Sequence, residues 1–197
     1  MVGIYQARNT VLCKKTEVKE KMTDTNKAWF AMKVFQNKIF EIEACLQAKG
    51  IETYFPFRYE EKIVGGVKQQ VRKPLITSLI FFRTFIQDTS AIERELTSKA
   101  TLYKYRKSHQ VAVIPDKEME IFRMVTSVDS DKWDYVDADS IHFSPHERVR
   151  VIGGRFEGAE GYIKRIKGNR RLVIAIEGVV AVATAYIPSC YLQKVDN

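Results

Sequence analysis

The sequence predicts an α+β N-terminal domain, in which helices flank an antiparallel sheet, followed by a small all-β barrel of the SH3-like type. Two observations predict this division. Apolar runs with strand spacing and with helix spacing are interleaved over residues 27–128, whereas residues 146–197 contain only short strand patterns that glycine and proline turns separate. The segment between them, residues 129–145, is acidic and has few large apolar side chains. It predicts a flexible linker and domains that fold and move independently.

Residues 1–26 mix lysine, glutamate, threonine and asparagine without a sustained apolar period, which predicts a flexible leader. The stretch 1–13 has no apolar core long enough for a signal peptide. The longest apolar run, residues 75–86, is interrupted by threonine, serine and arginine and is too short to span a bilayer. We therefore expect a soluble, cytoplasmic protein with no membrane partner.

The chain of 197 residues carries a formal net charge of +8, and 45% of its residues are hydrophobic, enough for the cores of two small domains. The basic excess favours a polyanionic partner, DNA or RNA, although many basic proteins bind no nucleic acid. Cys13, Cys45 and Cys190 are far apart and form no C-x-x-C pair. Reduced thiols are therefore expected, with neither a disulfide framework nor a zinc site.

The first strand is predicted at residues 28–35, which are rich in aromatic and branched side chains. Asn37 is expected to cap the helix that follows. The apolar side chains of that helix recur at helical spacing on one face: Ile39, Ile42, Cys45 and Leu46. Gly50 ends the helix, and residues 51–57 return to strand.

The rest of the N-terminal domain begins with a charged hairpin at residues 58–73, whose turn is the pair Gly65-Gly66. Residues 79–85 are nearly all apolar and predict an internal strand. The remaining elements are predicted as a helix at 89–96, a short strand at 102–105 and a helix at 115–128. Pro115 opens the last helix, and acidic side chains follow in its first turn.

In the C-terminal domain, two short strand patterns enclose a glycine-rich corner between residues 149 and 163. The glycines of this corner are expected to take positive φ and so to permit a tight reversal: Gly153, Gly154, Gly158 and Gly161. Phe156 is apolar in a polar loop and is expected to plug one end of a barrel. Glycine content alone would equally suit a glycine-rich hairpin in any all-β domain.

Three more strands are predicted at residues 171–176, 179–187 and 191–195, where Glu177-Gly178 and Pro188-Ser189 form the turns. Five short strands in about fifty residues suit an SH3-like barrel, because closure removes the exposed edges of a small open sheet.

The order V-x-V-x-x-G-x-F-x-G-x-x-G-x-I, present from Val149 to Ile163, resembles the KOW motif of transcription elongation factors and some ribosomal proteins. Residues 27–33, 50–56 and 74–82 look like the N-terminal (NGN) domain of the NusG family, in which a KOW domain follows across a flexible linker. The two resemblances together cover residues 27–197. They imply an NGN domain at 27–128 and a KOW domain at 146–197.

Two further segments, residues 114–120 and 182–189, are most similar to the UpxY-type specialised paralogues, which antiterminate transcription of capsular polysaccharide operons. The resemblance implies a transcription elongation and antitermination factor. Its NGN domain would bind the clamp helices of RNA polymerase and suppress pausing and termination. Its KOW barrel would recruit a second partner, such as a ribosomal protein or a termination or antitermination factor.

The same resemblance implies a set of apolar residues that bind RNA polymerase: Phe35, Tyr54, Ile76, Leu79 and Phe81. The chain departs from the family pattern P-L-F-P-G-Y-x-F, since Ile76, Thr77, Ser78 and Leu79 stand where F-P-G-Y is usual. Two aromatic anchors are therefore absent, although hydrophobicity is kept. The alternative is that all five residues belong to the core.

Basic residues cluster in one predicted hairpin of the KOW domain: Lys164, Arg165, Lys167, Arg170 and Arg171. They are expected to contact nucleic acid or a partner protein. The alternative function is a KOW-type ribosome- or RNA-binding protein that uses this hairpin on phosphates. Salt dependence separates the two functions, because phosphate contacts release counterions and apolar contacts do not.

No catalytic motif is present, so the chain is not expected to be an enzyme. His142 and His146 lie four apart, but Pro145 intervenes and no H-E-x-x-H motif accompanies them, so no metal site is expected. The glycine pairs lack the G-x-x-x-x-G-K-[ST] pattern of a phosphate-binding loop. No cofactor is expected.

Overall fold

The computed structural model describes residues 26–127, 133–136, 148–166, 168–176, 179–184 and 186–195. The leader predicted at residues 1–26 lies outside this part of the chain, except for Asn26. The elements of the N-terminal domain, residues 26–127, are β1 (Ala28–Val34), α2 (Ile39–Gln47), β2 (Glu52–Tyr54), β3 (Phe57–Val64), β4 (Val67–Pro74), β5 (Leu79–Thr84), α3 (Ile86–Glu95), β6 (Ala100–Leu102) and α4 (Asp116–Thr126).

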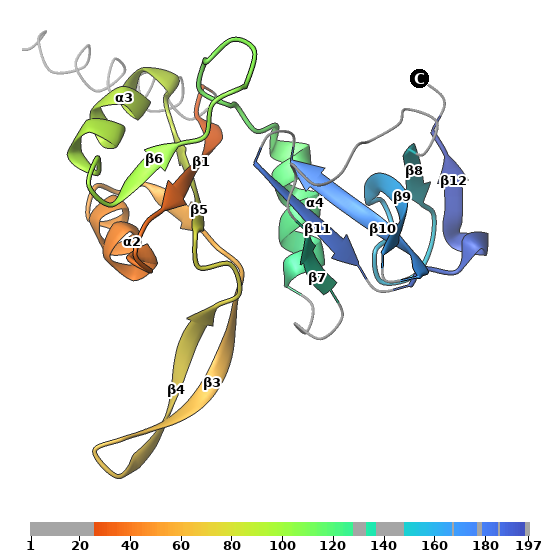
Figure 1. Cartoon of the computed structure of the whole chain (residues 1–197), viewed down its shortest axis with the longest axis horizontal. Coiled ribbons are helices and arrows are strands. Elements are labelled where there is room, and N and C mark those ends of the chain that lie inside the picture. Colours follow the sequence, from red (N-terminus) through yellow and green to blue (C-terminus); the bar gives the residue numbers. More distant parts are fainter. Residues whose placement is uncertain are drawn as a thin grey trace, which may run out of the picture.

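A four-stranded antiparallel sheet in the order β2-β5-β1-β6 forms the centre of the N-terminal domain. Alternation along β1 and β5 gives the sheet two apolar faces. One face, including Phe30 and Phe82, packs against α2 and α3, which lie together on one side of the sheet (Figure 1). The other face, including Trp29 and Phe81, packs against α4. The predicted α+β domain, with helices flanking an antiparallel sheet, is confirmed.

α4 begins directly after Pro115, whose fixed φ suits the start of a helix and whose missing N–H is not needed there. Asp116 and Glu118 occupy its first turn, where carboxylates are favoured by the helix dipole. Its buried side consists mostly of apolar side chains at helical spacing: Met119, Ile121, Phe122, Val125 and Thr126. This side faces the sheet.

The β3–β4 hairpin projects away from the body of the domain (Figure 1). Its strands pair from Phe57 opposite Pro74 to Val64 opposite Val67. Gly65 and Gly66 make the turn with φ of +60° and +82°, values that only glycine adopts without strain. The predicted charged hairpin is confirmed.

Several boundaries differ from the predictions. Asn37 does not cap α2, because both Gln36 and Asn37 take positive φ in a turn, and the helix begins at Ile39 without a side-chain cap. α3 begins at Ile86 instead of residue 89, and β6 ends at Leu102 where the predicted strand begins. The position of β6 is set by its hydrogen bonds to β1, and the strand propensity of residues 100–105 alone does not indicate where that pairing occurs.

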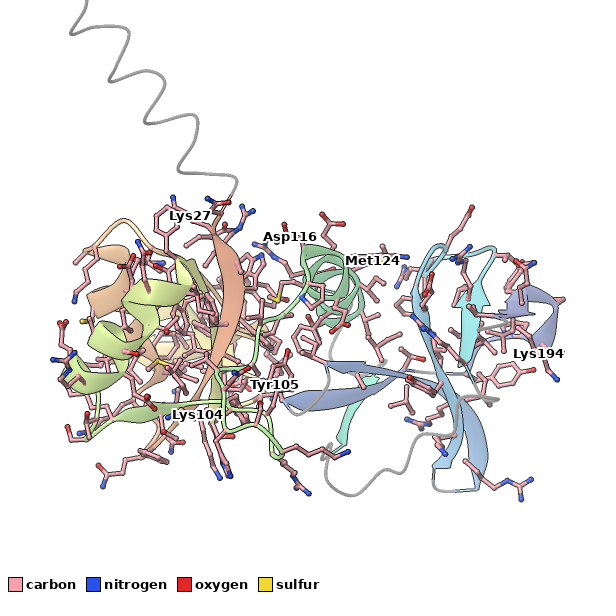
Figure 2. All side chains as sticks on the ribbon, turned by 90° about the horizontal axis from the view of Figure 1, so that it is seen from above. Lys27, Lys104, Tyr105, Asp116, Met124 and Lys194 are labelled. Atoms are coloured by element: carbon pink, nitrogen blue, oxygen red, sulfur yellow. The ribbon has the colours of Figure 1, made fainter. Side chains whose placement is uncertain are left out.

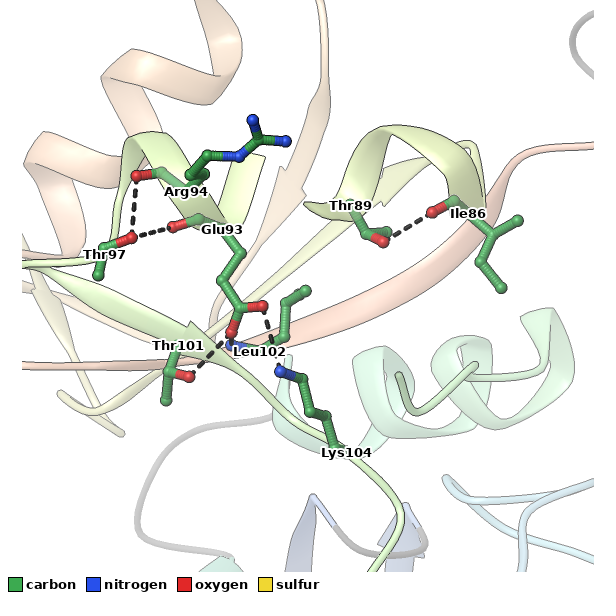
Figure 3. Close-up of polar contacts among 8 residues, drawn as sticks. All are labelled: Ile86, Thr89, Glu93, Arg94, Thr97, Thr101, Leu102 and Lys104. Carbon is green, nitrogen blue, oxygen red and sulfur yellow. Dashed lines mark hydrogen bonds and ion pairs between the residues drawn. The ribbon is translucent and has the colours of Figure 1, made fainter. Parts of the chain in front are cut away.

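Glu93 joins α3 to β6 (Figure 3). Its carboxylate accepts hydrogen bonds from the Leu102 N–H and the Thr101 hydroxyl, both at 2.9 Å, and lies 3.2 Å from Lys104 Nζ. Burial raises the pKa of Glu93, but these donors outweigh burial and hold the pKa below its ordinary value. The carboxylate therefore stays ionised and fixes the edge strand to the helix.

The C-terminal sheet consists of β7 (Trp133–Val136), β8 (Arg148–Val151), β9 (Glu160–Ile166), β10 (Asn169–Ile176), β11 (Val180–Thr184) and β12 (Leu192–Lys194). The strands are antiparallel in the order β12-β8-β9-β10-β11-β7. Within the described residues no pairing joins the two ends of this order. The all-β C-terminal part is confirmed, and the closed KOW barrel stays a prediction.

β7 lies inside the segment predicted as a linker, residues 129–145. It pairs with β11, with Trp133 opposite Thr184 and Val136 opposite Ala181. The predicted acidic linker therefore includes one strand, because backbone pairing with a neighbouring strand extends the sheet at residues 133–136. The rest of the predicted linker lies outside the described residues.

The glycine corner is only partly as predicted. Gly154 and Gly158 have positive φ, of +81° and +86°, whereas Gly153 and Gly161 do not. Gly161 is needed for a different reason: a Cβ there would lie 2.5 Å from the carbonyl oxygen of Val173 on β10. A Cβ at Gly153 would lie 2.9 Å from the ring of Tyr191. These two glycines permit close approach instead of an unusual backbone.

α4 also lies against β10, so the two parts of the molecule are in contact. One apolar cluster includes Phe122 and Val125 of α4 together with Leu172 and Ile174 of β10. Figure 2 shows α4, on which Asp116 and Met124 are labelled, between the N-terminal domain and the C-terminal sheet. The two domains were expected to move independently, but in this structure they are in contact through α4 and β10.

Candidate interaction surfaces

The five predicted polymerase-binding residues differ sharply in exposure. Ile76, Leu79 and Phe81 are buried, with Phe81 at 0% exposure. Tyr54 is half-buried, and Phe35 is 37% exposed. The structure therefore brings three of them into the core on the α4 side of the sheet and leaves two within reach of a partner.

Phe81 is held between two other rings. Its centroid lies 5.1 Å from that of Phe122 on α4 and 6.4 Å from that of Tyr54 on β2. The Tyr54 and Phe122 rings meet edge to face at 6.4 Å. Such aromatic packing stabilises the attachment of α4 to the sheet, so Phe81 has a structural role here.

Tyr54 is fixed at both ends. Its hydroxyl lies 2.6 Å from the Thr126 hydroxyl, and the Arg123 guanidinium lies 4.9 Å from the ring centroid. Burial raises the pKa of this phenol, and the hydrogen bond with Thr126 acts in the opposite direction. Arg123 also lies 5.3 Å from the Trp29 ring and 3.2 Å from Glu52 Oε1. Tyr54 therefore belongs to a rigid, half-buried rim at the edge of the sheet.

Phe35 follows β1 directly. The N–H of the preceding Val34 donates to the Ser78 carbonyl at 2.9 Å, which places the end of β1 beside the segment that carries Ile76 and Leu79. Among the five predicted polymerase-binding residues, Phe35 is thus the exposed aromatic one, and it lies next to the buried Ile76 and Leu79.

Glu160 gathers three cations at the contact between the two parts. Its carboxylate lies 2.7 Å from Arg150 Nη2, 3.0 Å from Arg148 Nη2 and 3.0 Å from Lys117 Nζ. The hydrogen bond from Arg150, followed by that from Lys117, lowers the pKa of Glu160 to about 2. Lys117 lies in the first turn of α4, so this ion pair crosses from the N-terminal domain to the C-terminal sheet. Nothing in the sequence indicates this ion pair, because Lys117 and Glu160 are 43 residues apart and belong to no common motif.

The basic hairpin of the C-terminal sheet is formed by β9 and β10. Lys164 lies directly opposite Arg171, and Arg165 lies directly opposite Arg170. Like charges at directly opposed positions disfavour strand pairing, yet this register gathers the basic residues on one hairpin. Arg165 is exposed, and Lys167 lies outside the described residues.

The base of the β3–β4 hairpin is anchored on α2, which the sequence patterns do not indicate. Arg72 donates to both carboxylate oxygens of Glu43, at 3.0 and 2.7 Å. Its guanidinium also lies 5.4, 5.6 and 5.3 Å from the centroids of Phe40, Phe55 and Phe57. A bidentate ion pair and stacking on rings suit the planar guanidinium, and together they fix the direction of the hairpin.

Within the described residues no group of histidine, cysteine, aspartate or glutamate side chains could hold a metal ion. None of the helices described here is both long and apolar enough to cross a membrane.

Comparison with known proteins gives a family match for the N-terminal domain. Residues 27–123 match the family model described as "NusG: Transcription termination factor nusG". No curated protein sequence matches the chain. A solved structure described as "Domain interaction in Thermotoga maritima NusG" is similar over 87% of this chain and 99% of that chain, with 17% sequence identity and a TM-score of 0.43.

Proposed function

Because residues 27–123 match the NusG family model, we propose that this protein is a transcription elongation and antitermination factor that binds RNA polymerase. The match of the N-terminal domain to that family is the observation that carries the proposal. The antiparallel sheet with helices on both faces is consistent with it. As a binding factor, the protein would act by docking on the polymerase and suppressing pausing or termination.

The proposed polymerase contact is the apolar region around the end of β1 and the Tyr54 rim. Phe35 and Tyr54 would reach the clamp helices of the polymerase, since Phe35 is exposed and Tyr54 is only half-buried. Ile76, Leu79 and Phe81 would support this surface from beneath, because they are buried. The absence of the family's aromatic residues at Ile76 and Leu79 leaves Phe35 as the main exposed anchor.

The C-terminal sheet is proposed to be a KOW barrel that recruits a second partner, such as a ribosomal protein or a termination or antitermination factor. The order β12-β8-β9-β10-β11, in which the last strand returns beside the first, supports this assignment. The operon-specific role of the UpxY-type paralogues, on capsular polysaccharide operons, belongs to the same proposal and is supported by the sequence patterns at residues 114–120 and 182–189.

The polymerase contact is tested with a matched pair of variants, Phe35→Ser and Phe40→Ser. Phe35 and Phe40 are similarly exposed, at 37% and 41%, but Phe40 lies on α2, on the other face of the sheet. Binding of each full-length variant to purified RNA polymerase is measured together with its melting temperature. We expect Phe35→Ser to weaken binding and Phe40→Ser to leave it unchanged, both with an intact fold. Equal binding by the two variants would remove Phe35 from the contact.

A KOW-type ribosome- or RNA-binding protein is the second candidate function. The opposed basic residues of β9 and β10 favour it, because they concentrate positive charge on one hairpin. Purification of the protein from its native cells distinguishes the candidates. Recovery of RNA polymerase supports the elongation factor, whereas recovery of ribosomal RNA with affinity that falls steeply with salt supports the alternative.

A further inference from the structure

The outer half of the β3–β4 hairpin, residues 61–70, is exposed at every position. The hairpin forms a two-stranded sheet of its own, so neither of its outer edges is paired with another strand of the described chain. Arg72 and Glu43 fasten its base to α2, and the hairpin projects from the domain as an arm (Figure 1). A free strand edge on an anchored arm is a template for a strand of another molecule.

The turn of the hairpin decides which residues of β3 present their backbone to the free edge. Residues 65–66 form a two-residue turn with positive φ at both positions, so the two residues that flank the turn bond to each other. Along an antiparallel ladder, pairs that bond to each other alternate with pairs that do not. The N–H and C=O groups of Tyr59, Glu61 and Ile63 therefore point away from β4, toward the place of a further strand.

Two apolar side chains of β3 are largely open to water. Ile63 is 73% exposed and Tyr59 is 62% exposed. Tyr59 ends a row of aromatic rings: its centroid lies 5.5 Å from that of Phe57, which lies 5.9 Å from that of Phe55. A further apolar side chain beside Tyr59 would extend this row and remove apolar surface from water.

Two charged groups of β3 can each take another partner. Glu60 accepts hydrogen bonds from Arg58 and Lys73, but all of them end on its Oε1 atom, and Oε2 has no donor among the described residues. Lys62 lies two residues further along the strand and makes no ion pair with a described residue. Because residues 60 and 62 lie on one face, two antiparallel copies of β3 can bring the carboxylate of one opposite the ammonium group of the other.

The sequence of β3 favours one register for such a pair. The two-fold axis must pass through a residue position, because an axis between positions would oppose residues that point outward with residues that point inward. An axis at residue 60 places two Glu60 side chains opposite each other, and an axis at residue 62 does the same with Lys62. Axes nearer the base bring the tip of one arm against the other domain, and axes nearer the tip overlap fewer residues.

An axis at Glu61 matches both the apolar and the charged side chains. It places Tyr59 of each copy opposite Ile63 of the other, an aromatic–branched pair that stabilises antiparallel sheets. It also places Glu60 of each copy opposite Lys62 of the other. A lysine usually protects a strand edge from pairing, but in this register it meets an acidic partner. β4 offers no such match, because its charged residues are all basic.

We propose that β3 pairs antiparallel with β3 of a second copy of this chain, with the two-fold axis at Glu61, so that the two arms form one four-stranded sheet. The unfavourable contact lies between the two Glu61 carboxylates, and Lys68, 3.4 Å from Glu61 in each arm, offsets it. The overlap of two arms is smaller than a standard interface of about 1,600 Å², so the dimer is weak and its population follows the protein concentration.

Sedimentation equilibrium of the full-length protein measures the dimer at concentrations up to about 1 mM, as a small interface requires. Ile63→Ser removes both apolar pairs. Val67→Ser is the matched control, because Val67 is similarly exposed, at 61%, but lies on β4. We expect Ile63→Ser to raise the Kd of the dimer about fivefold, since two cross-strand pairs are lost, and Val67→Ser to leave it unchanged. A monomer at every concentration, or equal effects of the two variants, would overturn the proposal.

The charged pairs are tested in the same assay by Lys62→Glu, which turns both attractive pairs into pairs of carboxylates. This variant should lose the dimer. Lys33→Glu makes the same change of charge at an exposed position on β1 and should keep the wild-type Kd. A dimer that the two variants weaken equally would overturn the assigned register.

The position of the axis is tested by cysteine pairing between copies. Glu61→Cys places two thiols at the axis, where facing Cα atoms lie about 5.5 Å apart, within the range that a disulfide bridges. Gln69→Cys is the control on the exposed part of β4. After equilibration with oxidised and reduced glutathione, mass spectrometry should find a disulfide between copies at residue 61 and none at residue 69. Any other pattern would overturn the proposal. None of these assays contains polymerase, so their outcome does not depend on the function proposed above.

Discussion

Gly161 lies where β9 approaches β10 most closely, and it has no room for a side chain. Besides the Val173 carbonyl at 2.5 Å, a Cβ would meet the Ile174 Cδ1 atom at 2.8 Å. We expect Gly161→Ala to lower the free energy of unfolding by about 1–3 kcal/mol, the usual cost of overpacking. Urea unfolding of the full-length chain measures it.

Gly158→Ala is the matched control, because Gly158 has open space around it but a φ of +86°. Its cost should be near 1 kcal/mol, the approximate penalty for a left-handed backbone with a Cβ. If Gly161→Ala is no more destabilising than Gly158→Ala, position 161 has room for a Cβ, and the close approach of β9 to β10 seen in the structure is wrong.

Single residues show where sequence reasoning succeeds and where it ends. The need for glycine at position 161 could be predicted from the motif, but its cause could not, because a contact with the Val173 carbonyl depends on how the next strand pairs. The apolar character of Ile76, Leu79 and Phe81 is equally plain from the sequence. Hydrophobicity does not distinguish a core position from a binding surface, and the structure places these three in the core.

At the scale of elements, the attachment of the β3–β4 hairpin to α2 depends on Arg72 and Glu43. The Glu43 side chain is only 9% exposed, so removing its partner leaves a poorly solvated carboxylate. We expect Arg72→Met to lower the free energy of unfolding by about 2 kcal/mol, less than for a fully buried pair because Arg72 is 38% exposed. Urea unfolding of the full-length variant measures the change.

A double-mutant cycle with Glu43→Gln isolates this pair. The double variant should be less destabilised than the sum of the single variants, with a coupling energy of at least about 0.5 kcal/mol. Arg58→Met, which breaks the more exposed pair with Glu60, should cost less than about 1 kcal/mol. Additive effects of the Arg72 and Glu43 substitutions would show that the two side chains do not interact in solution.

Most elements could be predicted because their patterns are local. The sheet strands β1 and β5 are short and apolar, and the β3–β4 turn has a glycine pair. β7 was not predicted because its four residues lie within an acidic segment and are too short to give a pattern of their own, although Trp133, Tyr135 and Val136 favour strands; the pairing with β11 shows the strand. The predicted Asn37 cap is wrong for a similar reason, since the turn that precedes α2 uses Asn37 in a left-handed conformation.

At the scale of the whole molecule, the ion pair between Lys117 and Glu160 reports whether α4 stays against the C-terminal sheet. The pKa of Glu160 is lowered from 4.5 to about 2, so its ion pairs stabilise the structure above pH 4.5. That stabilisation disappears as the pH falls through the interval from about 4.5 to about 2. We expect an NMR titration of the Glu160 carboxyl carbon to show a midpoint near 2.

Lys117→Met should raise this midpoint toward the ordinary value, although Arg150 and Arg148 still hold it low. Lys107→Met, at an exposed position, should leave it unchanged. A midpoint that does not respond to Lys117→Met would mean that the N-terminal domain and the C-terminal sheet are apart in solution.

The contact between the two parts could not be predicted from the sequence. The acidic composition of residues 129–145 predicts that the two domains stay apart. That inference considers only the segment that joins them and not the surfaces of the domains themselves. The contact depends instead on the apolar side of α4, which is wide enough to meet both the sheet of its own domain and β10. Helical periodicity predicts that this side is buried, but it does not identify the second surface that helps to bury it.

The proposed action on RNA polymerase during elongation is tested most directly by pause lifetimes on a purified transcription template. RNA polymerase and the full-length protein are the only proteins present. We expect the protein to shorten pauses at concentrations at which it binds the polymerase, and Phe35→Ser to need a higher concentration for the same effect than Phe40→Ser. Unchanged pause lifetimes with a folded protein in large excess, together with no binding to the polymerase, would contradict the proposed function.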